Sequence, residues 1–336
     1  MRVSAALPTG VAALFLDSAR RHRQIEALLV ERLLAGDFQE VILPVVDYLE
    51  PYEAMLTNTA SSWVARDELY RFVDRDGEVL ALRADFTPML ARLLAPRLAS
   101  LELPLQLFYR GDVLRYQEER VGRQRETYQL GAELLGLPGE AAERAALQQF
   151  LELLEVAEHR RLFVVMSFAG ALDQLLLTAA NGDAASDLAA AVMRRERRVA
   201  RRHQEALLQV VENGVPDDPS ELGEQAAERL ERVTAWSREI DEAFPGIDLR
   251  VDLAEFADQA LAPELQIAGG PRAYYDGLVF RAFAGDSAEP VGAGGRYDGL
   301  FHRLGAEVTA AGFSLSLDRL SGPADAAAVD AAEVTP

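Results

Sequence analysis

The chain has 336 residues and a formal net charge of −20, with 54 acidic residues against 34 arginines and no lysine or cysteine. Without lysine there is no P-loop lysine and no Schiff base, and without cysteine there is no thiol nucleophile, disulfide or thiolate metal site. Four scattered histidines predict no metal site, and we expect no cofactor. The acidic balance disfavours a long nucleic-acid-binding surface.

The sequence predicts no membrane segment. No apolar run reaches the ~18 residues that a membrane span requires. The N-terminal stretch is broken by Pro8 to Gly10 and by Asp17, which is not typical of a signal peptide. We therefore expect a cytoplasmic protein.

Hydrophobic periodicity predicts elements in an order typical of an α+β fold. Helical patterns are found over 11–35, 87–98 and 140–158 and in the block 169–245. Strand patterns, with a hairpin turn at Asp76-Gly77, are found at 38–43, 69–83, 105–115, 125–135, 162–168, 247–251, 274–283 and 310–317. Hairpin connections predict an antiparallel sheet flanked by helices. We expect one domain over 1–320 with a helical insertion at about 169–245, and a disordered acidic tail over 321–336.

Asp85 and Thr87 stand where a strand is predicted to give way to a helix, in the segment LRADFTPMLARL. Aspartate and threonine at such a junction are typical of a helix N-cap. A carboxylate and a hydroxyl could instead hold the ammonium group of a ligand. The segment alone leaves both interpretations open.

Side-chain alternation along the predicted strand 125–135 places polar residues on one face of the sheet. This face is formed by Arg123, Arg125, Thr127, Gln129, Gly131 and Glu133. The glycine would leave room for a flat group to lie on the sheet. The face is either a ligand-binding surface or a solvent-exposed one.

Paired glycines at Gly294-Gly295 precede the segment RYDG. They predict a tight backbone turn, which either is structural or lets a ligand approach the backbone closely.

Taken together, these stretches resemble the histidyl-tRNA synthetase family, which includes the regulatory subunits of ATP phosphoribosyltransferase, over about residues 6–320. DFQEVILP (37–44) resembles the dimer-forming first motif of class II aminoacyl-tRNA synthetases, with Asp37 in place of the usual glycine. The segments 114–136 and 312–320 resemble the second and third motifs. GGRYDGL is nearly diagnostic of the family. The resemblance implies the class II synthetase catalytic-domain fold and a dimer formed through the first motif.

The resemblance also implies a histidine pocket, in which a carboxylate accepts a hydrogen bond from one ring N–H and a phenol bonds the other ring nitrogen. The matching residues are Asp85 and Thr87 at the ammonium group, Glu133 with Tyr274 or Tyr275 at the imidazole, Gln129 and Arg115 near the backbone end, and Arg123 and Arg319 at the former phosphate site. We expect these residues to bind a ligand and none of them to catalyse.

Several positions depart from the synthetase pattern. Gly270 takes the place of the catalytic arginine, Gln117 replaces a glutamate, and Glu118-Glu119 would repel ATP. The residues after Arg319 are too few for an anticodon-binding domain. These departures predict a chain that does not charge tRNA.

With these departures, the resemblance implies a non-catalytic regulatory subunit in a hetero-oligomer with the short-form catalytic subunit of ATP phosphoribosyltransferase. That enzyme joins ATP to phosphoribosyl pyrophosphate in the first step of histidine biosynthesis. The chain would activate this partner, mediate feedback inhibition by L-histidine, and bind neither tRNA nor membranes. Two alternatives stay open: an enzyme that still activates histidine with ATP, which Arg115, Arg123 and Arg319 would support, and a scaffold that binds no ligand.

The run RRERRVARRH (194–203) places arginines around most of the surface of a predicted helix. One interpretation is a solvated helix with ion pairs to nearby acids. The other is a contact with the acidic tail or with the partner subunit.

Overall fold

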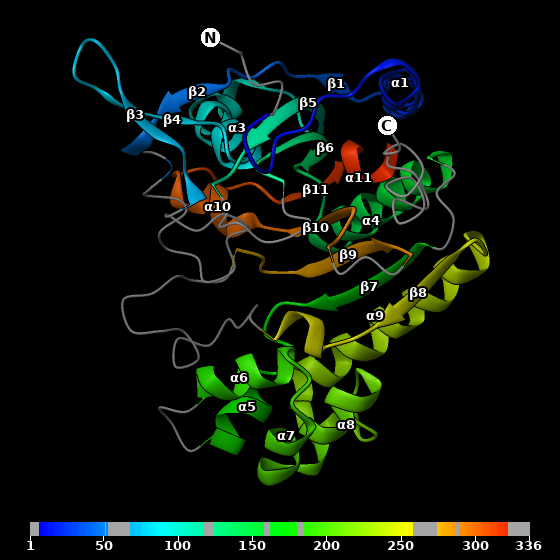
Figure 1. The fold of residues 1–336 in the computed structure, drawn as a ribbon. Helices are drawn as coiled ribbons and strands as arrows, with labels where there is room; N and C mark the ends of the chain where they lie inside the picture. Colours follow the sequence, from blue (N-terminus) through cyan, green and yellow to red (C-terminus); the bar gives the residue numbers. More distant parts are fainter. Residues whose placement is uncertain are drawn as a thin grey trace, which may run out of the picture.

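The computed structural model describes residues 7–50, 52, 68–116, 124–157, 162–180, 185–257, 274–285 and 289–321. Across these residues an eight-stranded sheet forms the centre of the molecule, in the order β1-β5-β6-β11-β10-β9-β7-β8 (Figure 1). Its strands are β1 (Gln39–Glu40), β5 (Leu105–Leu114), β6 (Glu126–Leu135), β7 (Leu162–Phe168), β8 (Ile247–Val251), β9 (Leu278–Ala284), β10 (Gly292–Arg296) and β11 (Ala310–Ser316).

The centre of the sheet is antiparallel, as the hairpin pattern predicts, but both edges depart from this. β1 pairs with β5 in parallel, and β8 pairs with β7 in parallel. β7 and β8 are connected through the helical block, and a long helical connection permits a parallel pair where a hairpin does not. The sheet is therefore mixed.

Side-chain alternation along β6 separates the two faces of the sheet. Leu130, Ala132 and Leu134 pack into the main core, on the face covered by α4 (Gly139–Val156). On the same side α1 (Leu16–Ala35) packs against α11 (Leu317–Ser321). The opposite face, to which Glu133 and Leu135 belong, is covered by α3 (Thr87–Leu94), the 3-10 helix η2 (Ala95–Ser100) and α10 (Asp298–Arg303).

A small antiparallel sheet lies beside the large one, in the order β2-β4-β3. Its strands are β2 (Val46–Tyr48), β3 (Arg71–Val73) and β4 (Val79–Leu82). β3 and β4 form the predicted hairpin, in which Gly77 has a φ of +87°. Glycine adopts this left-handed conformation without steric cost, which explains the turn at Asp76-Gly77.

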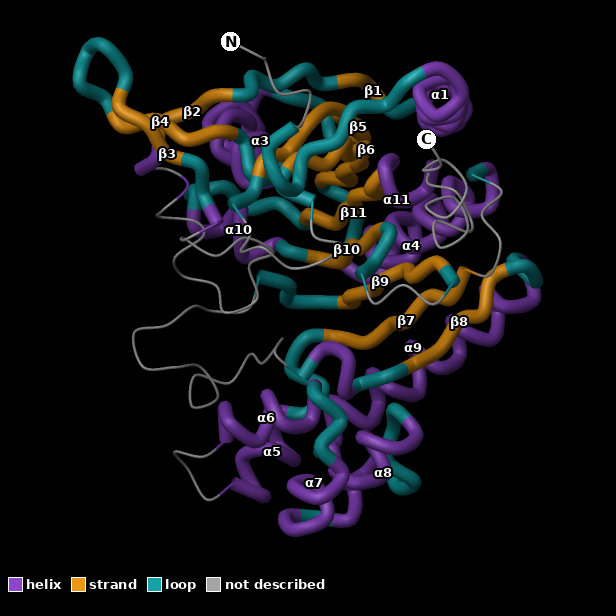
Figure 2. The backbone as a smooth tube through the Cα atoms, in the orientation of Figure 1, coloured by secondary structure: helices purple, strands orange, loops and turns teal. Residues whose placement is uncertain are grey.

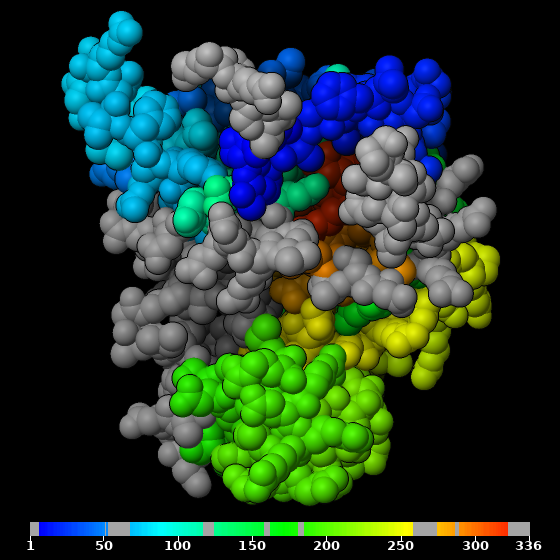
Figure 3. Space-filling view, viewed as in Figure 1, coloured from blue at the N-terminus to red at the C-terminus, as the bar shows by residue number. Residues whose placement is uncertain are grey.

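The segment between β7 and β8 is helical. It contains α5 (Asp173–Ala180), α6 (Ala185–Met193), α7 (Arg197–His203), α8 (Glu205–Asn213), η3 (Pro219–Leu222) and α9 (Glu224–Ala243), and η4 (Ala254–Phe256) follows β8. Figure 2 shows this helical block at the end of the sheet remote from α1, and in Figure 3 it forms a lobe drawn in green. The long helix α9 contacts β8 and so joins the block to the sheet.

The arginine run does not wrap around one helix, contrary to the prediction. Arg195 has a φ of +57° and pairs with Asp252 at 2.5 Å, so the chain turns before α7 begins. One surface hollow is lined by the four arginines of α7, which are Arg197, Arg198, Arg201 and Arg202. The helical spacing of these four positions places them on one side of α7, while the turn at Arg195 separates Arg194 and Arg195 from them.

The paired glycines form a central strand rather than the predicted turn. Gly294 and Gly295 lie in β10, between β9 and β11. A Cβ atom on Gly295 would come within 2.7 Å of the Tyr275 ring, and one on Gly294 would come within 2.4 Å of a β11 carbonyl. The glycines therefore allow close packing within the sheet, as glycine in the interior of a strand often does.

Candidate functional site

A cavity of about 100 Å³ lies on the face of the sheet that α3 and α10 cover. Its walls come from the start of α3, from β5 and β6, from the tyrosines before β9, and from β10, β11 and α11. The polar face of β6 predicted from sequence is one of these walls, with Arg125, Thr127, Gln129 and Glu133. Of the two interpretations of that face, the cavity favours a ligand-binding surface.

Glu133 is the polar centre of the cavity and is only 1% exposed. Its Oε1 atom accepts hydrogen bonds from the hydroxyls of Thr87 (2.7 Å) and Tyr109 (3.2 Å), and its Oε2 atom accepts one from the Tyr297 hydroxyl. Burial raises the pKa of Glu133 to about 8, although the three hydroxyl donors act against this shift. The carboxyl can therefore change its protonation state near neutral pH.

The neighbouring strand leaves room for this carboxyl. Gly312 of β11 lies opposite Glu133 of β6, and a Cβ atom on Gly312 would come 1.6 Å from Glu133 Oε2. Only glycine at position 312 permits the observed orientation of Glu133.

Asp85 both contacts the start of α3 and lines the cavity, and its contact with the ammonium group of a ligand stays a prediction. Its Oδ1 atom accepts the backbone N–H of Thr87 at 2.9 Å, which satisfies a free donor at the start of α3, and its side chain also lines the cavity. Arg115 lies on the other side, with Nη2 3.3 Å from Asp85 Oδ2 and Nε donating to the Ala84 carbonyl at 2.8 Å. Burial raises the pKa of Asp85, and the Arg115 charge opposes this rise.

A group of tyrosines closes the cavity around Glu133. Tyr274 and Tyr275 meet edge to face, with ring centroids 4.8 Å apart, and Tyr274 stacks on Tyr297 at 5.5 Å. The structure thus brings the predicted pair Tyr274-Tyr275 to the cavity. Tyr297 also donates its hydroxyl to Glu133, and this residue was not predicted from the sequence.

Tyr109 is the second residue that sequence reasoning missed. It lies directly opposite Gly131 in the β5–β6 pair, and a Cβ atom on Gly131 would come 2.5 Å from the Tyr109 ring. The flat group that Gly131 accommodates is therefore a side chain of the protein itself. The signal for this contact in the sequence is a tyrosine on one strand that can face a glycine on the next strand.

Buried cationic and polar groups surround the other end of the cavity. Arg319 donates to the Pro290 carbonyl at 2.5 Å and lies 3.4 Å from Glu289. Burial lowers the pKa of Arg319, and the nearby Arg115 charge lowers it further. Among the described residues, Gln124 Oε1 and Ser316 Oγ are buried in this wall without a hydrogen-bond partner. Such atoms are suited to bind a polar ligand or water.

One predicted site residue and four positions that depart from the synthetase pattern lie outside the described residues. They are Arg123, Gln117, Glu118, Glu119 and Gly270. The other predicted binding residues, Asp85, Thr87, Arg115, Gln129, Glu133, Tyr274, Tyr275 and Arg319, all line the one cavity.

The described ranges contain neither a helix suited to span a membrane nor a cluster of side chains suited to hold a metal ion. None of their helices combines the length and the apolar character that crossing a membrane requires. No group of three or more histidine, aspartate or glutamate side chains in these ranges is placed to hold a metal ion.

Comparison with known proteins relates the chain to one family. The family model described as histidyl-tRNA synthetase matches residues 10–320. The ATP phosphoribosyltransferase regulatory subunit of Symbiobacterium thermophilum is 33% identical over 94% of this chain and 78% of its own length. A histidine–tRNA ligase of Pyrobaculum islandicum is 30% identical over 89% of this chain and 70% of its own length.

A solved structure supports the same relationship. It is described as an ATP phosphoribosyltransferase regulatory subunit/histidyl-tRNA synthetase from Bacillus halodurans, and it covers 96% of this chain and 83% of its own. Its TM-score is 0.75 at 21% sequence identity. With the family match, this likeness confirms the predicted class II aminoacyl-tRNA synthetase fold.

Proposed function

Because the chain belongs to the histidyl-tRNA synthetase family, we propose that it is the non-catalytic regulatory subunit of ATP phosphoribosyltransferase. In this role it assembles with the short-form catalytic subunit in the cytoplasm, activates it, and makes it sensitive to L-histidine. The names of relatives such as the Symbiobacterium thermophilum protein support this choice within the family.

The proposal is carried by a cavity whose polar groups suit histidine, together with sequence changes at positions that resemble a phosphate site. Two carboxyl groups, the buried one of Glu133 and the partly buried one of Asp85, lie in one cavity with tyrosine hydroxyls. A ligand with an ammonium group at one end and an imidazole at the other matches this pattern of acceptors. In the sequence, Gly270 and Glu118-Glu119 replace groups that adenylation of such a ligand would need.

Regulation by this pocket requires that histidine bind two states of the complex with different affinity. The cavity is enclosed by elements from distant parts of the chain, namely α3, β6 and the segment 274–297. A ligand that bridges these elements stabilises one arrangement of them over others. This supports binding of the effector in the pocket.

We propose that the chain also pairs with a second copy of itself through the region of α1 and β1. Every well-exposed large apolar side chain in the described residues lies between 7 and 116. On α1 and beside β1 these include Leu16 (86% exposed), Leu34 (56%) and Ile42 (88%). β1 is also an edge strand of the large sheet. An exposed apolar surface next to a free strand edge favours a protein–protein interface.

Two experiments on the purified chain test the proposal. Histidine-dependent exchange of pyrophosphate into ATP would favour the alternative, an enzyme that activates histidine, and we expect no exchange. Titration calorimetry with histidine should give binding that Glu133→Ala abolishes. An absence of heat in both proteins would instead support a scaffold without a ligand.

A further inference from the structure

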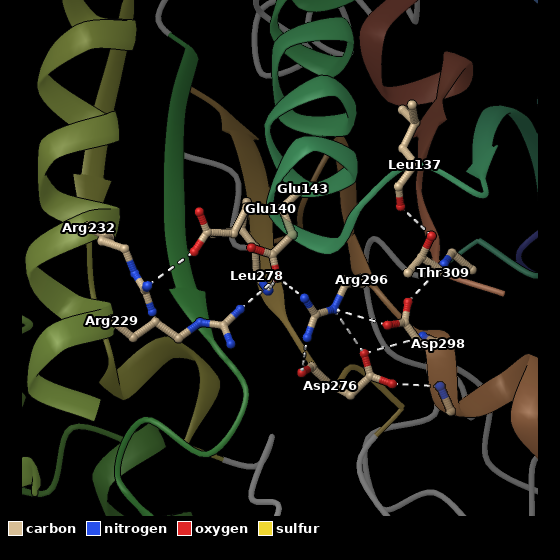
Figure 4. A network of polar contacts seen from close by, with 12 residues as sticks. Leu137, Glu140, Glu143, Arg229, Arg232, Asp276, Leu278, Arg296, Asp298 and Thr309 are labelled. Carbon is tan, nitrogen blue, oxygen red and sulfur yellow. Dashed lines mark hydrogen bonds and ion pairs between the residues drawn. The ribbon is translucent and has the colours of Figure 1, made fainter. Parts of the chain in front are cut away.

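An ion-pair network around one buried glutamate joins α9 of the helical block to α4, β9 and β10 (Figure 4). Its centre is Glu143 of α4, whose side chain is 2% exposed. Glu143 Oε1 accepts a hydrogen bond from Arg229 Nη2 of α9 at 2.6 Å and another from the Leu278 N–H of β9 at 2.9 Å. The same atom lies 3.1 Å from Arg296 Nη1 of β10. One carboxylate thus holds together two helices and two strands.

Arg296 extends the network toward the cavity. Its Nη2 atom donates to the Asp276 carbonyl at 3.1 Å, and its Nε atom lies 3.4 Å from Asp276 Oδ1 and 3.5 Å from Asp298 Oδ2. Asp276 accepts the backbone N–H groups of Asp298 at 3.2 Å and Gly299 at 2.6 Å. Asp298 in turn accepts the Ala310 N–H at 2.8 Å. These bonds fix the segments around 276 and 298 to each other.

The tyrosines of the cavity are the immediate neighbours of these residues. Tyr297, which donates to Glu133, lies between Arg296 and Asp298 in the sequence, and Tyr275 directly precedes Asp276. The other end of the cavity is held differently, because Asp85 is positioned by Arg115 and by the start of α3. The network therefore lies beside the tyrosine end of the cavity.

We propose that Arg229, in the helical block, is a positioning residue for the histidine pocket. Through Glu143 and Arg296, Arg229 holds Tyr297 in place opposite Glu133. The identity of the ligand rests on the proposed function. Arg229 is not part of the cavity wall. Because coupling between two sites is reciprocal, a ligand that fixes Tyr297 also favours one position of α9. Through this coupling, ligand binding in the pocket and the position of α9 in the helical block depend on each other.

A second ion pair supplies a matched control. Arg232 and Glu140 also join α9 to α4, at 3.2 Å, but their side chains are 53% and 58% exposed. Among the described residues, neither of them forms an ion pair with Arg296, whose partners are Glu143, Asp276 and Asp298. If the two ion pairs only attach α9 to α4, the removal of either pair should change the affinity for histidine equally.

The test is calorimetric binding of histidine to the full chain carrying Arg229→Met or Arg232→Met. Methionine keeps an apolar stem beside Phe168, over whose ring the Arg229 guanidinium lies at 5.4 Å. We expect Arg229→Met to weaken binding about fivefold or more, as is typical of coupled sites. Arg232→Met should change it less than about twofold, because exposed pairs contribute little.

A selectivity measurement separates positioning from general loosening. The preference for histidine over Nτ-methylhistidine depends on groups aligned at both ring nitrogens. The ratio of the two affinities should therefore decrease in Arg229→Met and stay unchanged in Arg232→Met. Should Arg229→Met not fold, Arg229→Lys keeps the charge without the two-pronged guanidinium, and it should show a smaller loss than Arg229→Met but a larger one than Arg232→Lys.

If Arg229→Met and Arg232→Met, or the two lysine variants, had equal affinity and selectivity for histidine, Arg229 would have no positioning role. The proposed function would be unaffected by that result. A wild-type chain that binds no histidine would overturn the proposed function and the positioning role together. The two failures are therefore distinguishable in one set of titrations.

Discussion

Tyr297 donates a hydrogen bond to Glu133, a residue 164 positions earlier in the chain. Glu133 lies in β6 and Tyr297 directly follows β10, and these two strands are not neighbours, because β11 lies between them in the sheet. Gly312 of β11 leaves the gap through which they meet. This contact places a buried carboxyl and a phenol side by side in the wall of the cavity.

Removal of the Tyr297 hydroxyl tests its part in binding. Tyr297→Phe keeps the stacked ring but leaves one buried oxygen of Glu133 without its donor. We expect histidine affinity to fall by about tenfold, in line with the cost of leaving a buried polar atom without its hydrogen-bond partner. Calorimetry is the measurement, and Tyr70→Phe, at a tyrosine outside the cavity, is the control. Unchanged affinity in Tyr297→Phe would exclude this hydroxyl from the binding site.

A methyl group at position 312 should disturb Glu133 directly. A Cβ atom there would come 1.6 Å from Glu133 Oε2, so Gly312→Ala forces the buried carboxyl to move. We expect a loss of about 1–3 kcal/mol in the free energy of unfolding, as for other overpacked sites. Gly246→Ala is the control, since no atom lies within 4 Å of the added methyl. Urea unfolding that gives the same loss for both variants would contradict the steric account.

The raised pKa of Glu133 predicts a pH dependence of stability. Burial moves this pKa from 4.5 to about 8, so between these pH values the folded chain binds the proton more tightly than the unfolded chain. The contribution is fully present below pH 4.5 and is lost as pH rises through 8. The free energy of unfolding should therefore fall across this window, by up to about 1.4 kcal/mol per pH unit.

Glu133→Gln isolates this contribution, because glutamine does not titrate. Urea unfolding across the same window should give a flatter pH dependence for the variant than for the wild type. Parallel curves for the two proteins would show that Glu133 has an ordinary pKa.

The proposed self-association predicts a sharp difference between two exposed apolar positions. Ile42 lies beside β1 and is 88% exposed, whereas Val73 lies on the β3–β4 hairpin and is 68% exposed. We expect Ile42→Asp to shift the chain from dimer to monomer in sedimentation experiments, because a charge is costly to bury in an interface. Val73→Asp should remain dimeric. If Val73→Asp were monomeric and Ile42→Asp dimeric, the interface would instead lie at the β3–β4 hairpin.

The parts of the fold that the sequence predicted are those with strong local periodicity. Strands β5, β6, β7 and β8 lie within about a residue of their expected positions, since alternating or continuous apolar runs mark them. β10 was missed because its sequence, GAGGR, has no strand propensity, and its conformation is imposed by β9 and β11. Tertiary packing, not local preference, decides that segment.

The candidate site was predictable where chemistry and sequence spacing coincide. Asp85, Thr87 and Glu133 were predicted and do line one cavity. Tyr109 and Tyr297 were not, because their proximity to Glu133 depends on strand register and on two glycines that admit large side chains. Likewise, the link from Arg229 to Arg296 through Glu143 joins three elements whose order along the chain gives no sign of it.

The most direct test of the regulatory role is the ATP phosphoribosyltransferase activity of a short-form catalytic subunit, measured with and without this chain across a range of histidine concentrations. We predict that the wild-type chain activates the enzyme and makes it sensitive to histidine, and that Glu133→Ala keeps the activation but loses the sensitivity. Equal activity with and without the chain at every histidine concentration would contradict the regulatory role.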